Sequence, residues 1–252
     1  MSASPSPRYD TIGRTYAEYR RPDPQIDAQI RAALDDARHV LNVGAGTGSY
    51  EPTDRAVVAL EPSPVLIAQR PPDAAPVVRG RAETLPFPDG AFDAVLALLT
   101  VHHWDDVDAG LRELQRVAPR QVVLTWDPVA MDSSSFWLTR EYLPEASGED
   151  WGFAALPEIL AGLADARVET VPVPHDCRDG FFRAYWRRPE AYLDPDVRGS
   201  ISALALVDDE LLAPGLARLR TDLESGAWHA HHADLFEHDA LDLGYRLVIA
   251  GA

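Results

Sequence analysis

Apolar residues recur at spacings of three and four positions in four parts of the chain, which is the pattern of amphipathic helices. The clearest of these segments begins among acidic residues and stops at Pro119. The predicted helices run from Tyr9 to Tyr19, over residues 26–34, over residues 107–118 and over residues 212–223.

Short apolar runs separate these helices and predict β-strands. Several of them lack polar alternation, which is typical of parallel strands covered on both faces. Strands that alternate with helices predict a doubly wound α/β fold, with a mostly parallel, Rossmann-like sheet of seven strands. The predicted strands lie at residues 39–43, 56–60, 76–79, 92–99, 120–126, 167–173 and 244–250.

The segment before the last predicted strand differs in character from the rest. Residues 181–192 are rich in aromatic side chains, and a helical leucine period follows them. We therefore expect residues 174–243 to form a helical insertion, a lid packed over one end of the sheet. Residues 1–37 are expected to form an N-terminal helical cap, and residues 38–173 with 244–252 to form the core.

Charge narrows the classes of function. The 252 residues carry 40 acidic and 23 basic side chains, a net charge of −17 that would repel a phosphate backbone, so we expect no nucleic-acid partner. All 23 basic residues are arginine. Without lysine, the sequence excludes Schiff-base chemistry, pyridoxal phosphate attachment and a P-loop NTPase.

Cysteine content and hydropathy indicate a reducing compartment. Cys177 is the one cysteine of the sequence, which excludes an internal disulfide and a multi-cysteine zinc site. The polar first residues do not form a signal peptide, and no apolar run approaches the ~18 residues of a membrane span. We expect a cytoplasmic monomer or homodimer without a membrane partner.

The sequence VLNVGAGTGSYEP (residues 40–52) holds the most informative motif. A predicted strand runs directly into Gly44, Gly46 and Gly48, as is needed where a ligand approaches the backbone closely. A dinucleotide fingerprint requires glycine at the sixth position, where this chain has Ser49, and a proline three residues later leaves little helix to hold a pyrophosphate. The alternative is a tight turn without a ligand.

Glu61 ends the second predicted strand. An acidic side chain at this end of the strand is placed to accept hydrogen bonds from ribose hydroxyls. The alternative is an acid at the start of a helix, but Ser63 and Pro64 already supply that start. We therefore favour ribose binding by Glu61.

Two later segments complete a family pattern. AETLPFPDGAFD (residues 82–93) follows the third predicted strand, and HHW (residues 102–104) follows the fourth. With the glycine loop and Glu61, they resemble the class I S-adenosylmethionine-dependent methyltransferases, in particular the small-molecule group with a UbiE-type (methyltransferase type 11) core. The resemblance covers residues 9–127 and implies S-adenosyl-L-methionine as cofactor and a small-molecule methyl acceptor.

The resemblance implies which residues meet the methionine end of the cofactor. Gly44, Ala45 and Gly46 would pass beneath it, and Leu99 and Thr100 would line it near the sulfonium. Tyr9 and Arg20, from the first helix, would cover the cofactor or meet its carboxylate, although each of the helix tyrosines is also suited to a core position.

At the other end of the cofactor, Glu61 would hold the ribose and Pro62 would lie against the adenine. Ala82 would contact the adenine edge through its backbone amide, with Glu83 beside it. One departure from the family pattern concerns the position before them. An Asp is usual there, but this chain has Arg81, which cannot accept a hydrogen bond from the adenine amino group.

Methyl transfer needs a base where the acceptor must lose a proton. His103, His102 and Asp127 are the candidates, because they follow central strands at the edge where α/β sheets bind ligands. Packing without catalysis is the alternative for each histidine, and helix capping is the alternative for Asp127.

Aromatic residues of the expected lid would form an apolar acceptor pocket. The candidates for substrate binding are Phe181, Tyr185, Trp186 and Trp228. A nearby histidine group matches no metal-binding spacing, so we expect solvated histidines and no metal there. Its members are His229, His231, His232 and His238.

The leading hypothesis is a methyltransferase that acts on an O, N or C atom of a small, partly apolar metabolite in specialised metabolism. Two alternatives are an NAD(P)-dependent oxidoreductase, disfavoured by Ser49, and a cofactor-retaining enzyme or module that does not methylate.

Overall fold

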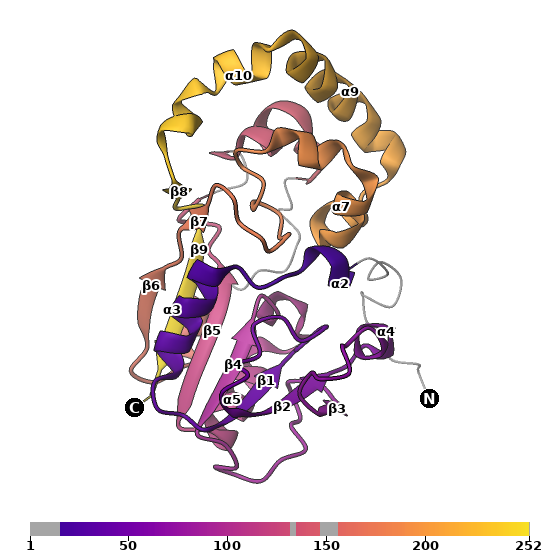
Figure 1. Cartoon of the computed structure of the whole chain (residues 1–252). Coiled ribbons are helices and arrows are strands. Elements are labelled where there is room, and N and C mark those ends of the chain that lie inside the picture. Colours follow the sequence, from indigo (N-terminus) through magenta and orange to yellow (C-terminus); the bar gives the residue numbers. More distant parts are fainter. Residues whose placement is uncertain (1–15, 132–134, 147–155, 252) are drawn as a thin grey trace.

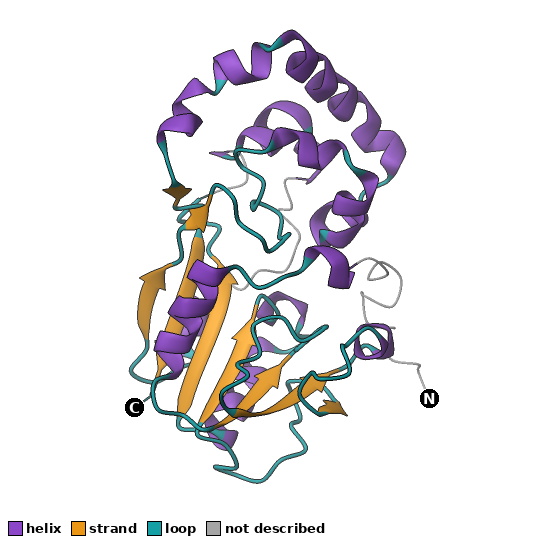
Figure 2. Ribbon diagram, in the orientation of Figure 1, coloured by secondary structure: helices purple, strands orange, loops and turns teal. Residues whose placement is uncertain are grey.

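The computed structural model describes residues 16–131, 135–146 and 156–251. Its centre is a seven-stranded sheet in the order β3–β2–β1–β4–β5–β9–β6 (Figures 1 and 2). β9 runs antiparallel to both of its neighbours, and the other adjacent pairs are parallel, which confirms the predicted fold. The strands are β1 His39–Val43, β2 Ala56–Glu61, β3 Val77–Arg79, β4 Ala94–Leu98, β5 Arg120–Trp126, β6 Arg167–Thr170 and β9 Tyr245–Ala250.

Two strands are shorter than their apolar runs. The run at 92–99 loses its ends because Asp93 accepts hydrogen bonds from the backbone of residues 38 and 39, and Leu99 turns away with φ of 51°. The run at 167–173 breaks at Pro172, which has no N–H for a ladder. Beyond this break, β7 (Val173–Pro174) pairs instead with β8 (Ala240–Leu241) in a separate two-stranded sheet.

Helices cover both faces of the large sheet. α3 (Pro24–Leu34) lies across one face and buries Ile26, Ile30 and Leu34, the residues whose spacing predicts it (Figure 1). α5 (Val107–Val117) and α6 (Leu156–Ala161) pack on the opposite face. The short α4 (Pro64–Ala68) follows β2, with Ser63 as its N-cap.

No helix follows β1, in agreement with the early proline at 52: residues 44–55, all described, form turns. An ion pair holds this loop in place of a helix. Arg70 donates from Nη2 to both carboxylate oxygens of Glu51 at 2.7 and 2.8 Å, and from Nη1 to the carbonyl of Gly46 at 3.2 Å. Both side chains of the pair are almost completely buried.

The segment of residues 174–243, which we expect to be the lid, lies over the carboxyl end of the sheet and is mainly helical (Figure 2). It arches through α7 (Pro195–Ser200), α8 (Ser202–Ala205), α9 (Asp209–Ser225) and α10 (Ala227–His231). A π-helical turn at Leu138–Tyr142 packs beneath α9, and α2 (Tyr16–Tyr19) contacts α7. None of the helices in the described ranges is long and apolar enough to cross a membrane.

Candidate functional site

The glycine loop turns sharply at the end of β1. The N–H groups of Gly44 and Ala45 both donate to the carbonyl of Leu60, at 2.8 and 3.1 Å. Gly44 has φ of +66°, and a Cβ there would lie 2.0 Å from Oγ1 of Thr100. Glycine is therefore required at this position by its backbone conformation and by the contact with Thr100, two residues after β4.

Glu61 joins this loop to the end of β2. Its buried carboxylate accepts from the N–H of Gly46 at 2.8 Å and from the N–H of Ser63 at 2.9 Å. These two bonds fix the orientation of the carboxylate at the end of β2. A cis-diol beside the loop would meet an acceptor already fixed in orientation.

A cavity lies above the glycine loop, between the N-terminal segment and the end of β4. It brings together four of the predicted cofactor positions from the loop and the first helix, together with Leu99, whereas Tyr9 lies outside the described residues. Its lining residues are Arg20, Asn42, Gly44, Ala45, Gly46, Thr47, Ser49, Tyr50, Leu98, Leu99 and Leu124.

Two contacts at this cavity were not foreseen from the sequence. Tyr50 is buried with φ of 62° and donates from its hydroxyl to Asp179 at 3.1 Å. Ser49 donates to the carbonyl of Arg20 at 2.7 Å. Asp179 comes from the lid, 129 positions after Tyr50, and no local sequence pattern indicates this partnership.

At the expected adenine end, the guanidinium of Arg81 is paired with carboxylates of the protein. Its guanidinium forms an ion pair with Asp105 and lies 3.7 Å from Glu83. Glu83 in turn accepts from the N–H of Asp105 at 2.8 Å. These contacts join the loops after β3 and β4, beside the buried Ala82, so Arg81 has a structural partner where the family has an Asp.

The candidate bases lie at the ends of β4 and β5. His102 and His103 form a short 3-10 turn, Val101–His103, with ring centroids 3.8 Å apart. The cavity lining described above includes neither histidine. Asp127 accepts from the N–H of Val129 at 3.0 Å, so its carboxylate stabilises a turn over residues 128–130, where its capping alternative expects a helix.

The lid aromatics are mostly packed in its core. Trp186 is fully buried and donates to the carbonyl of Val173 at 3.1 Å, and Trp228 packs against Trp137 with centroids 5.1 Å apart. Phe181 and Tyr185 keep a small exposed fraction, 6% and 9%. All four predicted acceptor contacts therefore belong to the buried core, and none of them lines the cavity at the glycine loop.

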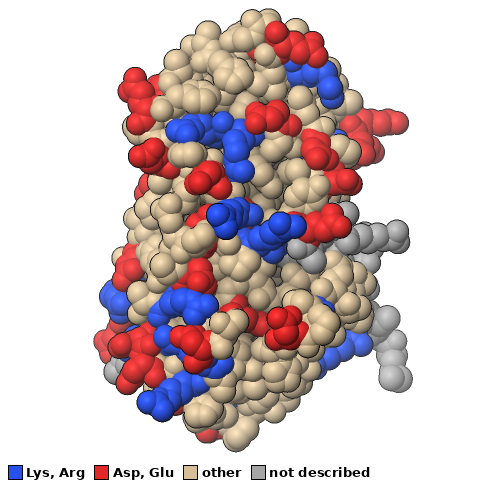
Figure 3. All heavy atoms as spheres, viewed as in Figure 1, with Lys and Arg blue, Asp and Glu red and all other residues tan. Residues whose placement is uncertain are grey.

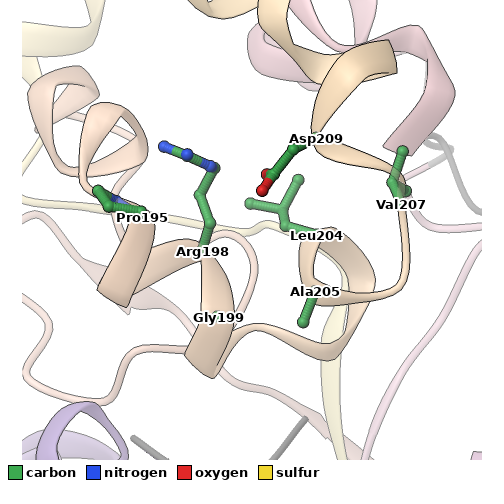
Figure 4. Close-up of a pocket in the computed structure, with 7 residues that line it drawn as sticks. All are labelled: Pro195, Arg198, Gly199, Leu204, Ala205, Val207 and Asp209. Carbon is green, nitrogen blue, oxygen red and sulfur yellow. The ribbon is translucent and has the colours of Figure 1, made fainter.

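Two further features of the lid lie apart from the glycine loop. Figure 4 shows a pocket among α7, α8 and the start of α9, where Arg198 donates to the carbonyl of Tyr192 at 2.9 Å. Elsewhere, Glu141, His231 and His232 each have an atom of a type that binds metal ions, and these three atoms lie within 4.8 Å of one another. Arg140 already donates to Glu141 at 2.5 Å, and His232 is buried with its Nε2 3.1 Å from Glu141, so His232 is not solvated as the sequence analysis expects.

Comparison with known proteins places the fold and the loop in one family. Residues 41–124 match the model of a methyltransferase domain. A crystal structure from Anabaena variabilis, described as a methyltransferase from an antibiotic biosynthesis pathway, superposes with a TM-score of 0.86 at 30% identity. It covers 95% of this chain and 100% of its own. The chain belongs to the class I S-adenosylmethionine-dependent methyltransferases.

Curated relatives of this methyltransferase match over shorter stretches. Demethylmenaquinone methyltransferase of Thermus thermophilus is 32% identical over 151 residues, which span 51% of this chain and 65% of that protein. Methyltransferase YcgJ of Bacillus subtilis is 29% identical over 104 residues, 36% of this chain and 41% of its own length. The chain therefore spans less than two thirds of these relatives.

The family cofactor is S-adenosyl-L-methionine, and the described residues fit it. Gly44 lines the cavity, and the loop can turn there against the side chain of Thr100 only because Gly44 has none. Glu61 presents a buried carboxylate beside that loop, and Arg20 presents a cation at the cavity wall. This set of donors and acceptors matches a ligand with a ribose at one point and an amino-acid carboxylate at another.

Proposed function

We propose that this methyltransferase moves a methyl group from S-adenosylmethionine to an O, N or C atom of a small, partly apolar metabolite in specialised metabolism. The observation that carries the proposal is the similarity to the Anabaena protein, which extends through the lid as well as the core. The lid is the part of the chain expected to contact the acceptor. The description of that relative motivates the assignment to specialised metabolism.

In this proposal each end of the cofactor has its own set of residues. Gly44, Ala45 and Gly46 support the methionine part, with Leu99 and Thr100 beside the sulfonium and Tyr9 and Arg20 closing over it. Glu61 holds the ribose, and Pro62, Ala82 and Glu83 border the adenine. The hydrogen bonds that Glu61 accepts from the N–H groups of Gly46 and Ser63 support this placement, because they orient the carboxylate before a ligand arrives.

When bound, the cofactor would supply a methyl group on a sulfonium: an in-line nucleophile would form a bond to the methyl carbon as the carbon–sulfur bond breaks, with S-adenosylhomocysteine as the leaving group. The protein then contributes mainly position and exclusion of water. His103 is proposed to accept the proton of a hydroxyl acceptor, with His102 packed beside it and Asp127 as the alternative base. The proposed acceptor wall comprises Phe181, Tyr185, Trp186 and Trp228, whose aromatic faces also suit a nearby positive charge.

Product analysis tests the proposal. The protein is incubated with S-adenosylmethionine carrying a deuterated methyl group and a panel of phenols, amines and hydroxylated apolar metabolites. We expect a product in which a CD3 group replaces one hydrogen of the acceptor, from at least one class, together with S-adenosylhomocysteine. Calorimetric binding of S-adenosylhomocysteine and NADH distinguishes this reading from an oxidoreductase, which would bind the nicotinamide cofactor in preference.

A cofactor-retaining enzyme that does not methylate is the second candidate. The [4+2]-cyclase SpnF covers 98% of this chain with a TM-score of 0.52, although 18% identity makes this a likeness of fold alone. Tight binding of S-adenosylmethionine without any labelled product across the panel would favour this candidate. The oxidoreductase reading is weakened further, because residues 47–55 form no helix to hold a pyrophosphate.

We further propose a cytoplasmic monomer or homodimer that binds neither nucleic acid nor membrane. On the face shown in Figure 3, acidic and basic side chains are interspersed, and no basic surface extends across it. The net charge of −17 supports the same view. Light scattering at several concentrations would measure the oligomeric state.

A further inference from the structure

The lid contributes one fully buried carboxylate to the cofactor end of the molecule. Asp179 has no exposed surface, and its Oδ1 accepts from Nε of Arg20 at 2.5 Å. Its Oδ2 accepts from Nη2 of the same arginine at 3.4 Å and from the hydroxyl of Tyr50 at 3.1 Å. One lid residue therefore contacts both the N-terminal segment and the glycine loop.

The backbone around Asp179 is hydrogen-bonded to the N-terminal segment as well. Residues 20 and 179 form an antiparallel bridge, and the N–H of Gly180 donates to the carbonyl of Tyr19 at 2.9 Å. The N–H of Arg178 donates to the carboxylate of Asp23 at 3.1 Å. Because these bonds fix the backbone of both segments, the carboxylate of Asp179 and the guanidinium of Arg20 meet in one defined orientation.

The arginine held in this way faces the cofactor cavity. Arg20 lines that cavity together with the glycine loop, and its side chain is 12% exposed. Guanidinium groups recognise carboxylates through paired N–H groups, and their recognition depends on a fixed plane. A buried ion pair contributes more to a fixed side-chain orientation than to the stability of the fold, because desolvation offsets much of its attraction.

We propose that Asp179 is a positioning residue that fixes the guanidinium of Arg20 for the carboxylate of the methionine part of S-adenosylmethionine. Through this pair, the lid and the N-terminal segment jointly recognise the amino-acid end of the cofactor, and the adenosine end is recognised independently of them. The inference rests on the proposed function, since it assigns the cofactor carboxylate to Arg20.

Two ligands that share the adenosine test the inference. S-adenosylhomocysteine carries the amino-acid group, and 5′-methylthioadenosine lacks it. In Asp179→Asn, we expect the Kd for S-adenosylhomocysteine to rise about tenfold, the scale of one charge-assisted hydrogen bond. The Kd for 5′-methylthioadenosine should stay within about twofold. Asp27→Asn is the matched control, because Asp27 accepts from Nε of Arg31 at 2.7 Å on α3, and it should change neither Kd.

A double-mutant cycle separates positioning from general damage. In an Arg20→Ala background, Asp179→Asn should cause no further loss of S-adenosylhomocysteine affinity, because its effect acts through the arginine. If Asp179→Asn does not fold, Tyr50→Phe removes one hydrogen bond from the same carboxylate and keeps both charges. That variant should also weaken S-adenosylhomocysteine selectively, by a smaller factor.

The outcomes are distinguishable. Equal weakening of both ligands, or no change in either, in the folded variants would overturn the role of Asp179. Failure of the unmodified protein to bind S-adenosylhomocysteine would instead overturn the proposed function. Selective loss of the ligand with the amino-acid group supports the inference.

Discussion

A Cβ at position 44 would lie 2.0 Å from Oγ1 and 2.7 Å from Cβ of Thr100, so the glycine loop and the end of β4 touch where the cofactor is expected. Gly44→Ala should therefore destabilise the fold and weaken S-adenosylhomocysteine binding. Gly90→Ala is the matched control, since Gly90 has a similar φ of +64° with nothing within 4 Å of its Cβ. We expect about 1 kcal/mol from backbone strain at position 90 and at least twice that at position 44, measured by urea unfolding.

Glu61→Ala should weaken S-adenosylhomocysteine binding by about 1–3 kcal/mol, because the ribose loses a charged hydrogen-bond acceptor. Titration calorimetry measures the change, with thermal unfolding to check that the variant remains folded. Glu169→Ala, on the distant edge strand β6, should leave the affinity unaltered. An unchanged affinity in the Glu61 variant would make this residue structural.

The buried pair Glu51–Arg70 predicts a large loss of stability on removal of one partner. Arg70→Ala leaves the Glu51 carboxylate buried without its cation, which should cost about 3 kcal/mol in free energy of unfolding. Arg31→Ala removes a more exposed pair with Asp27 and should cost less than about 1 kcal/mol. Denaturant unfolding compares the two, and similar losses would contradict the importance of burial.

His103→Ala should reduce turnover of a hydroxyl acceptor about 100-fold or more, while affinity for S-adenosylmethionine stays within about threefold. His102→Ala should lower stability more than it lowers the rate. Turnover and cofactor affinity are measured for both variants. Full activity of His103→Ala would show that proximity suffices or that Asp127 is the base, and a parallel loss of affinity would place His103 in the cofactor pocket.

Burial raises the pKa of the Cys177 thiol above its ordinary value, with the nearby carboxylates of Asp179 and Asp23 adding to the rise. The thiolate fraction at pH 8 is therefore lower than in an exposed cysteine, and the thiol is also sterically protected. Ellman's reagent at pH 8 should release no thionitrobenzoate from the native protein and one equivalent after denaturation. Rapid reaction of the native protein would refute this burial.

The sequence predicts local features of this fold better than contacts between distant segments. β1 and β5 begin and end where their apolar runs do, and the missing helix after β1 follows from an early proline. These properties depend on neighbours in the chain. The partners of Arg20, Tyr50 and Arg81 depend instead on how loops meet in space. The spacing of apolar residues along the sequence does not indicate such contacts.

The same distinction applies to the lid. Helical leucine spacing predicts α9, but it does not indicate that Trp186 and Trp228 are buried by other protein side chains, because an aromatic-rich segment can pack inward or face a ligand. The burial of Phe181 and Tyr185 in the same core likewise requires the three-dimensional packing.

The loop after β1 takes its shape from a residue 19 positions further along the chain, because Arg70 supports Glu51 where a helix would otherwise support the turn. The glycine motif is therefore not a self-contained module. If residues 40–52 were grafted onto another α/β sheet, or combined with a foreign second half in a chimera, the turn would lose the ion pair between Glu51 and Arg70 that supports it. Recombination within this family should preserve positions 51 and 70 as a linked pair, and libraries that separate them should be depleted of folded members.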